Sequence, residues 1–149
     1  MAFTIRLEST AAADRLWAVL TDFPGHERLV PATTIQTDPG TPRVGWEFTA
    51  TTGRGAAAVP DRMLLTVWEP PVRFRLVKLG PVLTGWVDVS VTMAGPGSCL
   101  TWTEEVRPRA FPRALQPVVD ATAERAYRRV LASFVAAAEQ ATPETQGNS

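Results

Sequence analysis

The amino-acid sequence predicts an α+β fold: a curved seven-stranded antiparallel sheet gripping a long C-terminal helix, with two short helices after the first strand. Three observations predict it. An alternating strand opens the chain, six further candidate strands follow with only Gly/Pro turns between them, and a long amphipathic segment comes last. Because that segment is long enough to cover one face of the sheet, we expect one domain over residues 1–141, followed by a polar, disordered tail over 142–149.

The elements follow in a simple order along the chain. Residues 3–9 alternate apolar and polar side chains, as a half-buried strand does. Ser9 or Thr10 then offers a helix cap, and apolar side chains recur behind it at helical spacing. Residues 23–31 form the second short helical segment, which Pro31 ends. The remaining strands are expected at 33–38, 44–52, 61–69, 72–79, 83–94 and 98–106.

The segment that Pro112 opens, ending at Gln140, has the periodicity of one long helix. Its polar back carries Arg125, Arg128 and Arg129, which is typical of a solvated helix face. Its apolar arc is expected to face the sheet. The arc contains Leu115, Val119, Ala123, Ala126, Tyr127, Val130, Phe134 and Ala137.

Composition and charge argue against several classes of function. Lys plus Arg and Asp plus Glu number 15 each, so no net charge draws the chain to nucleic acid or to an anionic membrane. A single cysteine excludes an internal disulfide and a cysteine-based metal cluster, and a single histidine leaves a zinc site incomplete, so we expect no metal. The sequence has no glycine-rich phosphate loop and no dinucleotide-binding fingerprint, so we expect no cofactor.

We expect neither a targeting segment nor a membrane span. The opening MAFTIRLEST lacks a basic region followed by an apolar run, which a signal peptide needs. No apolar stretch approaches the roughly 18 residues that cross a bilayer. We therefore expect a cytoplasmic protein, and the scarcity of lysine among its basic residues is typical of a GC-rich bacterial genome.

Four stretches together resemble one superfamily. They are ADRLWAVLTDF, VGWEF, TVWEPPVRFRL and GSCLTWTEEVRP, and the resemblance covers about residues 2–141. In their order and spacing, the chain is similar to the START-like, or SRPBCC, superfamily with its Bet v 1-like helix-grip fold, and within it to the bacterial polyketide cyclase/dehydrase and lipid-transport group. The resemblance implies an apolar ligand held between the sheet and the long helix, but fold alone does not settle activity.

The side chains expected between sheet and helix form a mostly apolar wall, as in small-molecule pockets. Ala123 and Ala126 lie at the middle of the helix arc and leave room that larger residues would fill, and Tyr127 adds a hydroxyl. A solid core without a cavity is the alternative. The expected ligand-binding residues are Trp46, Phe48, Phe74, Leu76, Val87, Val89, Leu100, Trp102, Glu104, Thr122, Ala123, Ala126, Tyr127 and Val130.

Glu104 is an unexpected acid on an apolar strand face. In CLTWTEEVRP it shares a face with Leu100 and Trp102, because side chains alternate along a strand. Three interpretations remain open: a wet carboxylate at the cavity mouth, an ion pair with the inward-facing Lys78, or an acid/base whose pKa is raised by desolvation. A β-bulge would exchange Glu104 with Glu105.

Other reactive or bulky side chains have simpler interpretations. His26, in a Pro-Gly loop, is expected to be a solvated loop residue rather than a base or a metal ligand. Cys99 faces outward and nothing nearby lowers its thiol pKa, so a catalytic thiol is not expected. Trp68 remains ambiguous. Simple alternation places Trp86 on the outer face, where it would mark an interface, whereas a bulge near Gly85 would turn it inward.

Three functions remain open. The first is a protein that binds a small hydrophobic molecule, such as a lipid, an isoprenoid or a polyketide, as a monomer or homodimer. The second, which the resemblance implies, is a cyclase/aromatase that uses the same cavity, with Glu104 and Tyr127, and His26 beside them, as the acid/base candidates. The third is a ligand-free interaction module that assembles through its outer tryptophans.

Overall fold

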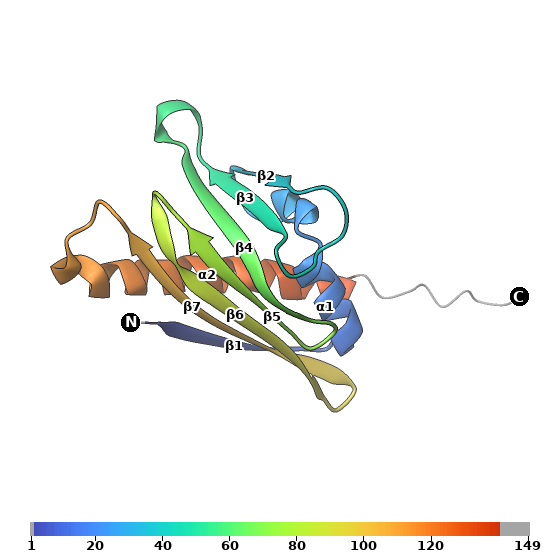
Figure 1. Ribbon diagram of the computed structural model, residues 1–149. Coiled ribbons are helices and arrows are strands. Elements are labelled where there is room, and N and C mark those ends of the chain that lie inside the picture. The colour runs from blue at the N-terminus through green and yellow to red at the C-terminus, as the bar shows by residue number, and fades with distance from the viewer. Residues whose placement is uncertain (1, 141–149) are drawn as a thin grey trace, which may run out of the picture.

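The computed structural model describes residues 2–140 and has the predicted fold class, a seven-stranded antiparallel sheet with a long C-terminal helix (Figure 1). The strands are β1 (Phe3–Ser9), β2 (Thr33–Thr37), β3 (Glu47–Thr52), β4 (Val59–Glu69), β5 (Arg73–Leu79), β6 (Leu83–Ala94) and β7 (Gly97–Pro108). The α-helices are α1 (Ala13–Thr21) and α2 (Gln116–Gln140), and the short 3₁₀ helices are η1 (Pro24–Arg28), η2 (Gly55–Ala57) and η3 (Arg113–Leu115). The tail expected over 142–149 lies outside the described residues.

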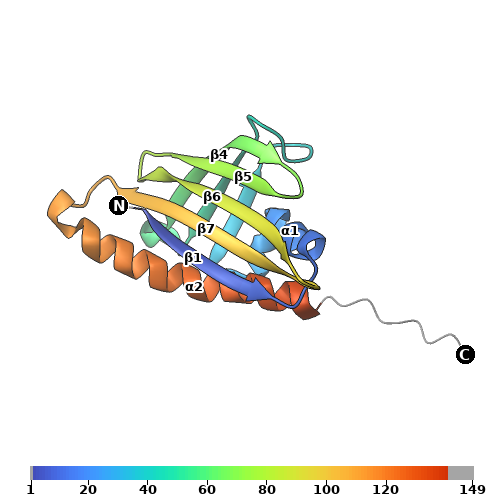
Figure 2. The ribbon, with the colours of Figure 1, turned by 90° about the horizontal axis from the view of Figure 1, so that it is seen from below.

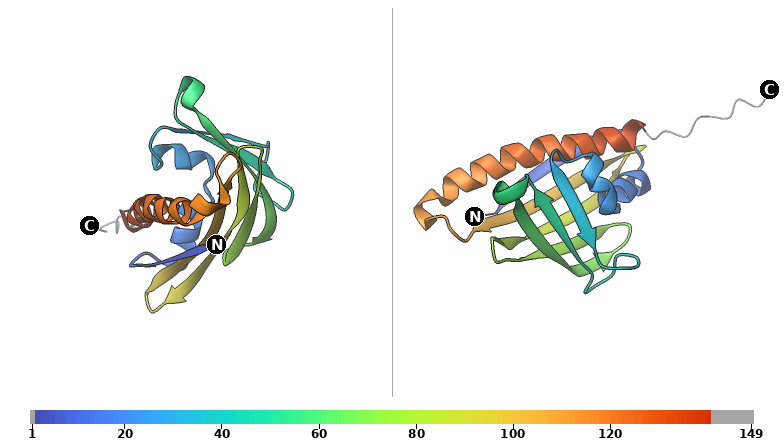
Figure 3. Two further views of the ribbon diagram at one scale, coloured as in Figure 1. Left: turned by 90° about the vertical axis from the view of Figure 1, so that its left-hand side faces the viewer. Right: turned by 90° about the horizontal axis from the view of Figure 1, so that it is seen from above.

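The sheet curls around α2, which lies on its concave side (Figure 3). The strand order is β1-β7-β6-β5-β4-β3-β2, so the first strand of the chain pairs with the last. That pairing runs in unbroken register from Phe3 opposite Glu104 to Ser9 opposite Ser98. Seen from below, β1, β7 and α2 run side by side (Figure 2). The concave face therefore has α2 as its cover and the six consecutive strands β2 to β7 as its wall.

The C-terminal half of α2 makes the firmest contact with the core. Its buried residues are Leu131, Phe134, Val135 and Ala138. Leu115, which the periodicity placed on the buried arc, is instead 43% exposed, because it lies in η3 before α2 begins, at the end that extends past the sheet (Figure 2). Although α2 is long, no helix among residues 2–140 is long and apolar enough to cross a membrane.

Two strands begin two or more residues away from the predicted start. The strand expected from residue 44 begins only at Glu47, because Gly45 takes a φ of 90° and the N–H of Trp46 closes a turn onto the carbonyl of Arg43. The next strand begins earlier than expected, at Val59, which pairs with the last residue of β3. Here the left-handed Gly45 delays the start of the strand although it lies inside an apolar run.

The two tryptophans whose orientation the sequence left open, Trp68 and Trp86, lie on opposite faces of the sheet. A register shift between Leu65 and Val67 turns Trp68 to the inner face, where its ring lies 5.4 Å from that of Trp17. No such shift occurs where β6 pairs with its neighbours, so Trp86 stays on the outer face, with the guanidinium of Arg75 4.6 Å above its ring. That cation–π contact occupies one face of the Trp86 ring.

Candidate functional site

A cavity of about 310 Å³ lies between the concave face of the sheet, η1 and α2. Its lining is mostly apolar and comes from β2 to β7 as well as from the helices. Eight of the residues expected from the sequence line it: Phe48, Phe74, Leu76, Val87, Trp102, Ala126, Tyr127 and Val130. Further lining residues include Phe23, Ile35, Ala50, Val59, Met63, Leu83 and Phe134.

The other expected ligand-binding residues do not line this cavity. Trp46, Val89 and Leu100 are buried in the core. Ala123 packs against that core, and Glu104 lies fully buried outside the cavity lining. Thr122, which does not belong to the predicted apolar arc, is exposed on the outer side of α2 and does not line this cavity.

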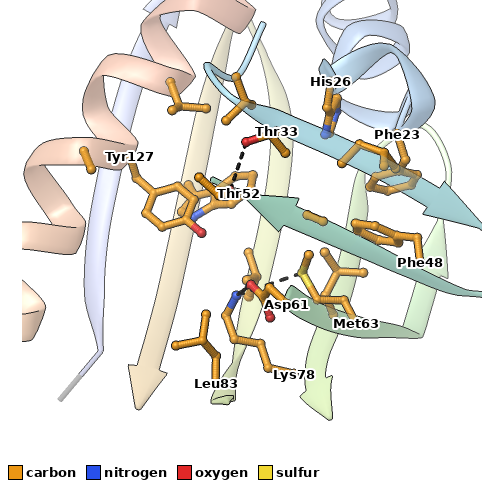
Figure 4. Close-up of a pocket in the computed structure, with 18 of the residues that line it drawn as sticks. Phe23, His26, Thr33, Phe48, Thr52, Asp61, Met63, Lys78, Leu83 and Tyr127 are labelled. Carbon is orange, nitrogen blue, oxygen red and sulfur yellow. Dashed lines mark hydrogen bonds and ion pairs between the residues drawn. The ribbon is translucent and has the colours of Figure 1, made fainter. Parts of the chain in front are cut away.

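A buried charge cluster lies at one end of the cavity (Figure 4). The Nζ of Lys78 donates a hydrogen bond to Oδ2 of Asp61 and lies 3.3 Å from Oε1 of Glu104. The indole N–H of Trp102 donates to the other oxygen of Glu104, at 2.9 Å. The Glu104 side chain is 0% exposed, so a wet carboxylate at the mouth is wrong and the ion pair with Lys78 is what forms.

Alternation along four strands assembles this cluster. Lys78, on β5, pairs with Met63 of β4 and with Gly85 of β6. Glu104, on β7, pairs with Val87 of β6, two residues beyond Gly85, so it lies diagonally across β6 from the lysine. No bulge interrupts β7, and Glu104 therefore keeps the inward face that its sequence parity predicted.

Burial and neighbouring charges shift the pKa values of Glu104 and Lys78. Burial raises the pKa of the Glu104 carboxyl, against the opposing attraction of Lys78 and the hydrogen bond from Trp102. Burial alone would lower the pKa of Lys78, but attraction to Tyr127, Glu104 and Asp61 outweighs it, and the pKa lies above the ordinary value. Lys78 therefore stays protonated, while the pKa of the Glu104 carboxyl lies above its ordinary value.

Tyr127 joins the cluster from α2. Its ring stacks on Trp102 with centroids 5.8 Å apart, and its hydroxyl points into the cavity (Figure 4). Burial raises the pKa of the Tyr127 hydroxyl, and the charge of Glu104 raises it further. The phenol is thus a neutral group that both donates and accepts a hydrogen bond at the cavity wall.

His26 is part of the cavity wall, which corrects its interpretation as a solvated loop residue. Its ring stacks on Phe134, with centroids 4.6 Å apart, and meets Phe23 edge-on at 5.4 Å. Its Nε2 is 2.9 Å from the carbonyl oxygen of Leu20. Burial lowers the pKa of His26, although the Leu20 carbonyl and Asp22 oppose this. The neutral ring, donating from Nε2, is therefore the favoured form.

Substituting glutamine for His26 should reduce the pH dependence of stability below neutrality. Since the pKa of His26 is lowered on folding, the unfolded chain takes up a proton that the folded protein resists as pH falls below about 6.5. The free energy of unfolding should therefore fall more between about pH 7.5 and 5.5 in the wild type than in His26→Gln, whose amide still reaches the Leu20 carbonyl. Urea denaturation at both pH values measures this. Equal changes in the two proteins would contradict a buried, neutral His26.

Sequence reasoning missed Asp61, although a signal was present. Asp61 has the inward parity of Met63 and Leu65 on β4 and is 8% exposed. It stood at the first position of the expected strand, where inward and outward faces are least defined. Cys99 is half-buried, with its thiol near the carbonyl of Leu100. Within residues 2–140, no three His, Cys, Asp or Glu side chains are grouped so as to hold a metal ion.

Comparisons with known proteins agree with this architecture. A family model described as polyketide cyclase/dehydrase and lipid transport matches residues 2–139. No curated protein sequence matches the chain.

Solved structures share the fold at low sequence identity. The aromatase/cyclase ZhuI from Streptomyces sp. R1128 has a TM-score of 0.77 and 14% identity, over 99% of each chain. A START superfamily protein from Mycobacterium smegmatis has a TM-score of 0.75 and 14% identity, over 95% of this chain and 99% of the other. The protein TTHA0849 from Thermus thermophilus has a TM-score of 0.79 and 11% identity, over 95% of this chain and 99% of the other.

Proposed function

This chain belongs to the polyketide cyclase/dehydrase and lipid-transport family, and on that premise we propose that it binds a small hydrophobic molecule in the cavity between the sheet and α2. The observation that carries the proposal is the cavity itself, about 310 Å³ with a mainly apolar lining. Ligand pockets have volumes of roughly 300–1,000 Å³ and combine apolar walls with a few polar groups. A lipid, an isoprenoid or a polyketide-like molecule with few rings has the apolar character to enter this space.

Native mass spectrometry of the freshly purified protein tests this proposal first. A stoichiometric apolar adduct, identified after denaturation, would support binding and name a class of ligand. A protein that is bare, and that takes up no member of a panel of fatty acids, isoprenoids and aromatic polyketides, would contradict it. That result would favour the ligand-free interaction module instead.

Placing tryptophan at position 126 should block the cavity. Ala126 lines it from α2, and an indole there would occupy the space that a ligand needs. We expect Ala126→Trp to bind the neutral fluorescent probe N-phenyl-1-naphthylamine roughly tenfold or more weakly than the wild type, in a fluorescence titration. Ala132→Trp is the matched control, because Ala132 is exposed on the same helix and lines no part of the cavity. Unchanged probe binding in Ala126→Trp, with the fold intact, would place the binding site elsewhere.

A second function, cyclisation and dehydration of a poly-β-ketone, is favoured by the charge cluster. Tyr127 lines the cavity and interacts with Glu104, which in turn meets Lys78. Such a chain of titratable groups can move a proton to or from a substrate held against Tyr127. In this candidate reaction Tyr127 is the catalytic acid/base, and Glu104 acts through it as a positioning residue and proton partner.

Glu104→Gln separates the two functions. The amide keeps the shape of the side chain but holds no exchangeable acidic proton, so binding should be spared. If the second function holds, turnover of a poly-β-ketone substrate should fall roughly 10²–10⁴-fold in kcat. Glu105→Gln is the control, since Glu105 faces outward and pairs with Arg107 on the other side of the sheet. Unchanged turnover in Glu104→Gln would remove Glu104 from the reaction.

A further inference from the structure

We propose that the ligand of this cavity is an uncharged apolar molecule carrying a hydroxyl group, and that Asp61 accepts the hydrogen bond of that hydroxyl. The inference rests on the proposed binding function and names the chemistry that the cavity selects. It predicts that the protein distinguishes an alcohol or phenol from the carboxylate with the same skeleton.

The first argument is an unused acceptor. Asp61 lines the cavity, and its Oδ2 is taken by Lys78. Its other carboxylate oxygen, Oδ1, is buried and accepts no hydrogen bond from the residues the structure describes. A buried acceptor without a donor is destabilising, and more so when the group is charged. A hydroxyl on the ligand is the donor that would satisfy it, at the end of the cavity where Figure 4 shows Asp61 and Lys78 together.

The second argument is the absence of a spare positive charge. Lys78 and His26 carry the only basic side chains among the described residues that line the cavity. Lys78 already faces two carboxylates, Asp61 and Glu104, so its positive charge is already neutralised and does not stabilise a further anion on the ligand. His26 directs Nε2 at the Leu20 carbonyl and is packed between aromatic rings. A ligand carboxylate or phosphate would therefore be buried without a cation, which is strongly unfavourable.

The third argument is that the other polar groups of the lining have partners within the protein. The hydroxyls of Thr33 and Thr52 are 2.9 Å apart and bond to each other. Tyr127 interacts with Glu104. Apart from these side chains, His26, Asp61 and Lys78, the lining is apolar, so one donor on an otherwise apolar ligand matches the cavity. A volume near the lower end of the usual range favours a molecule of about two rings or a similar aliphatic skeleton.

Isothermal titration calorimetry with three naphthalenes tests the proposal on the wild-type protein. The probes are 2-naphthol, 2-naphthoate and unsubstituted naphthalene, at neutral pH, where the naphthol is uncharged and the naphthoate is ionised. We expect 2-naphthol to bind roughly tenfold or more tightly than either of the others, as a hydrogen bond to a charged acceptor allows. If 2-naphthoate binds as well as 2-naphthol, or naphthalene does, the inference is wrong while the binding function stands. If none of the three binds, and the panel in native mass spectrometry also fails, the binding function itself is wrong.

Asp61→Asn tests the assigned residue. Because Lys78 offers only donors, the amide oxygen of the asparagine turns toward it, and the amide N–H₂ takes the place of the free acceptor in the cavity. The advantage of 2-naphthol over naphthalene should disappear in this variant. Asp14→Asn, with the same change of charge on the exposed start of α1, should keep it. A preference that survives in Asp61→Asn overturns the role of Asp61; if the variant does not fold, the wild-type series alone decides whether a neutral hydroxyl is selected.

Discussion

Lys78→Met should destabilise the protein by about 3–5 kcal/mol, because it removes the one cation that faces two buried carboxylates. Methionine keeps the length of the stem and its packing beside Met63, so the loss reports on charge rather than on a cavity. Asp61 and Glu104 would then lie together at 8% and 0% exposure without a counter-ion. The loss should shrink as pH falls, since protonation removes both negative charges. Urea denaturation followed by tryptophan fluorescence measures it.

Arg107→Met is the matched control for this prediction. Arg107 pairs with Glu105 on the outer face of the sheet, where its side chain is 60% exposed. Exposed ion pairs contribute under about 1 kcal/mol, so this variant should change stability little. A double variant, Lys78→Met with Glu104→Gln, should recover part of the loss, because one buried charge is removed with the other. A Lys78→Met protein as stable as Arg107→Met would show that the cluster is not held by charge.

Gly85→Ala should cost about 3 kcal/mol or more, through a backbone clash in the middle of the sheet. Gly85 has a φ of 129°, and a Cβ added there would lie 1.8 Å from the carbonyl oxygen of Glu105. Neither atom belongs to a flexible side chain, so β6 and β7 would have to separate. Gly85 is also opposite Lys78, and the displacement would reach the charge cluster. Thermal unfolding followed by circular dichroism measures the effect.

Gly95→Ala controls for backbone strain alone. Gly95 lies in the turn between β6 and β7 with a φ of 58°, and an added Cβ would meet nothing within 4 Å. It should therefore cost only the strain of a left-handed alanine, about 1 kcal/mol. If Gly85→Ala costs no more than Gly95→Ala, the close approach of β6 to Glu105 is not a constraint on the fold.

Local periodicity was enough to predict the fold and the inward positions of two of the three charged residues in the cluster. The inward position of Glu104 follows from alternation alone, because β7 pairs without a bulge on both sides. Lys78 has the parity of Leu76 on β5, along which buried and less buried residues alternate. An ion pair with Lys78 was one of the three interpretations of Glu104. Where a strand pairs without a register shift, alternation along the sequence correctly predicts the face of the sheet on which a side chain lies.

The features that the sequence pattern did not predict depend on contacts between distant residues. Trp68 faces inward because of a register shift that no feature of the neighbouring sequence predicts. His26 is enclosed because Phe134, on a helix far along the chain, packs against its ring. Leu115 is exposed because it precedes α2, whose buried residues lie in its C-terminal half, whereas a helical wheel weights all turns equally.

The pairing of β1 with β7 joins two strands that are made at very different times. During synthesis β1 emerges first, but its hydrogen-bonding partner is complete only when the chain has been made past Pro108. Pairing between strands far apart in sequence is slow to form, because closing the large loop between them costs entropy before any stabilising contact is made. Asp61 and Lys78 meet earlier, because β4 and β5 are consecutive in sequence. The lysine therefore acquires its second carboxylate, Glu104, only when β7 has been made and has paired with β6.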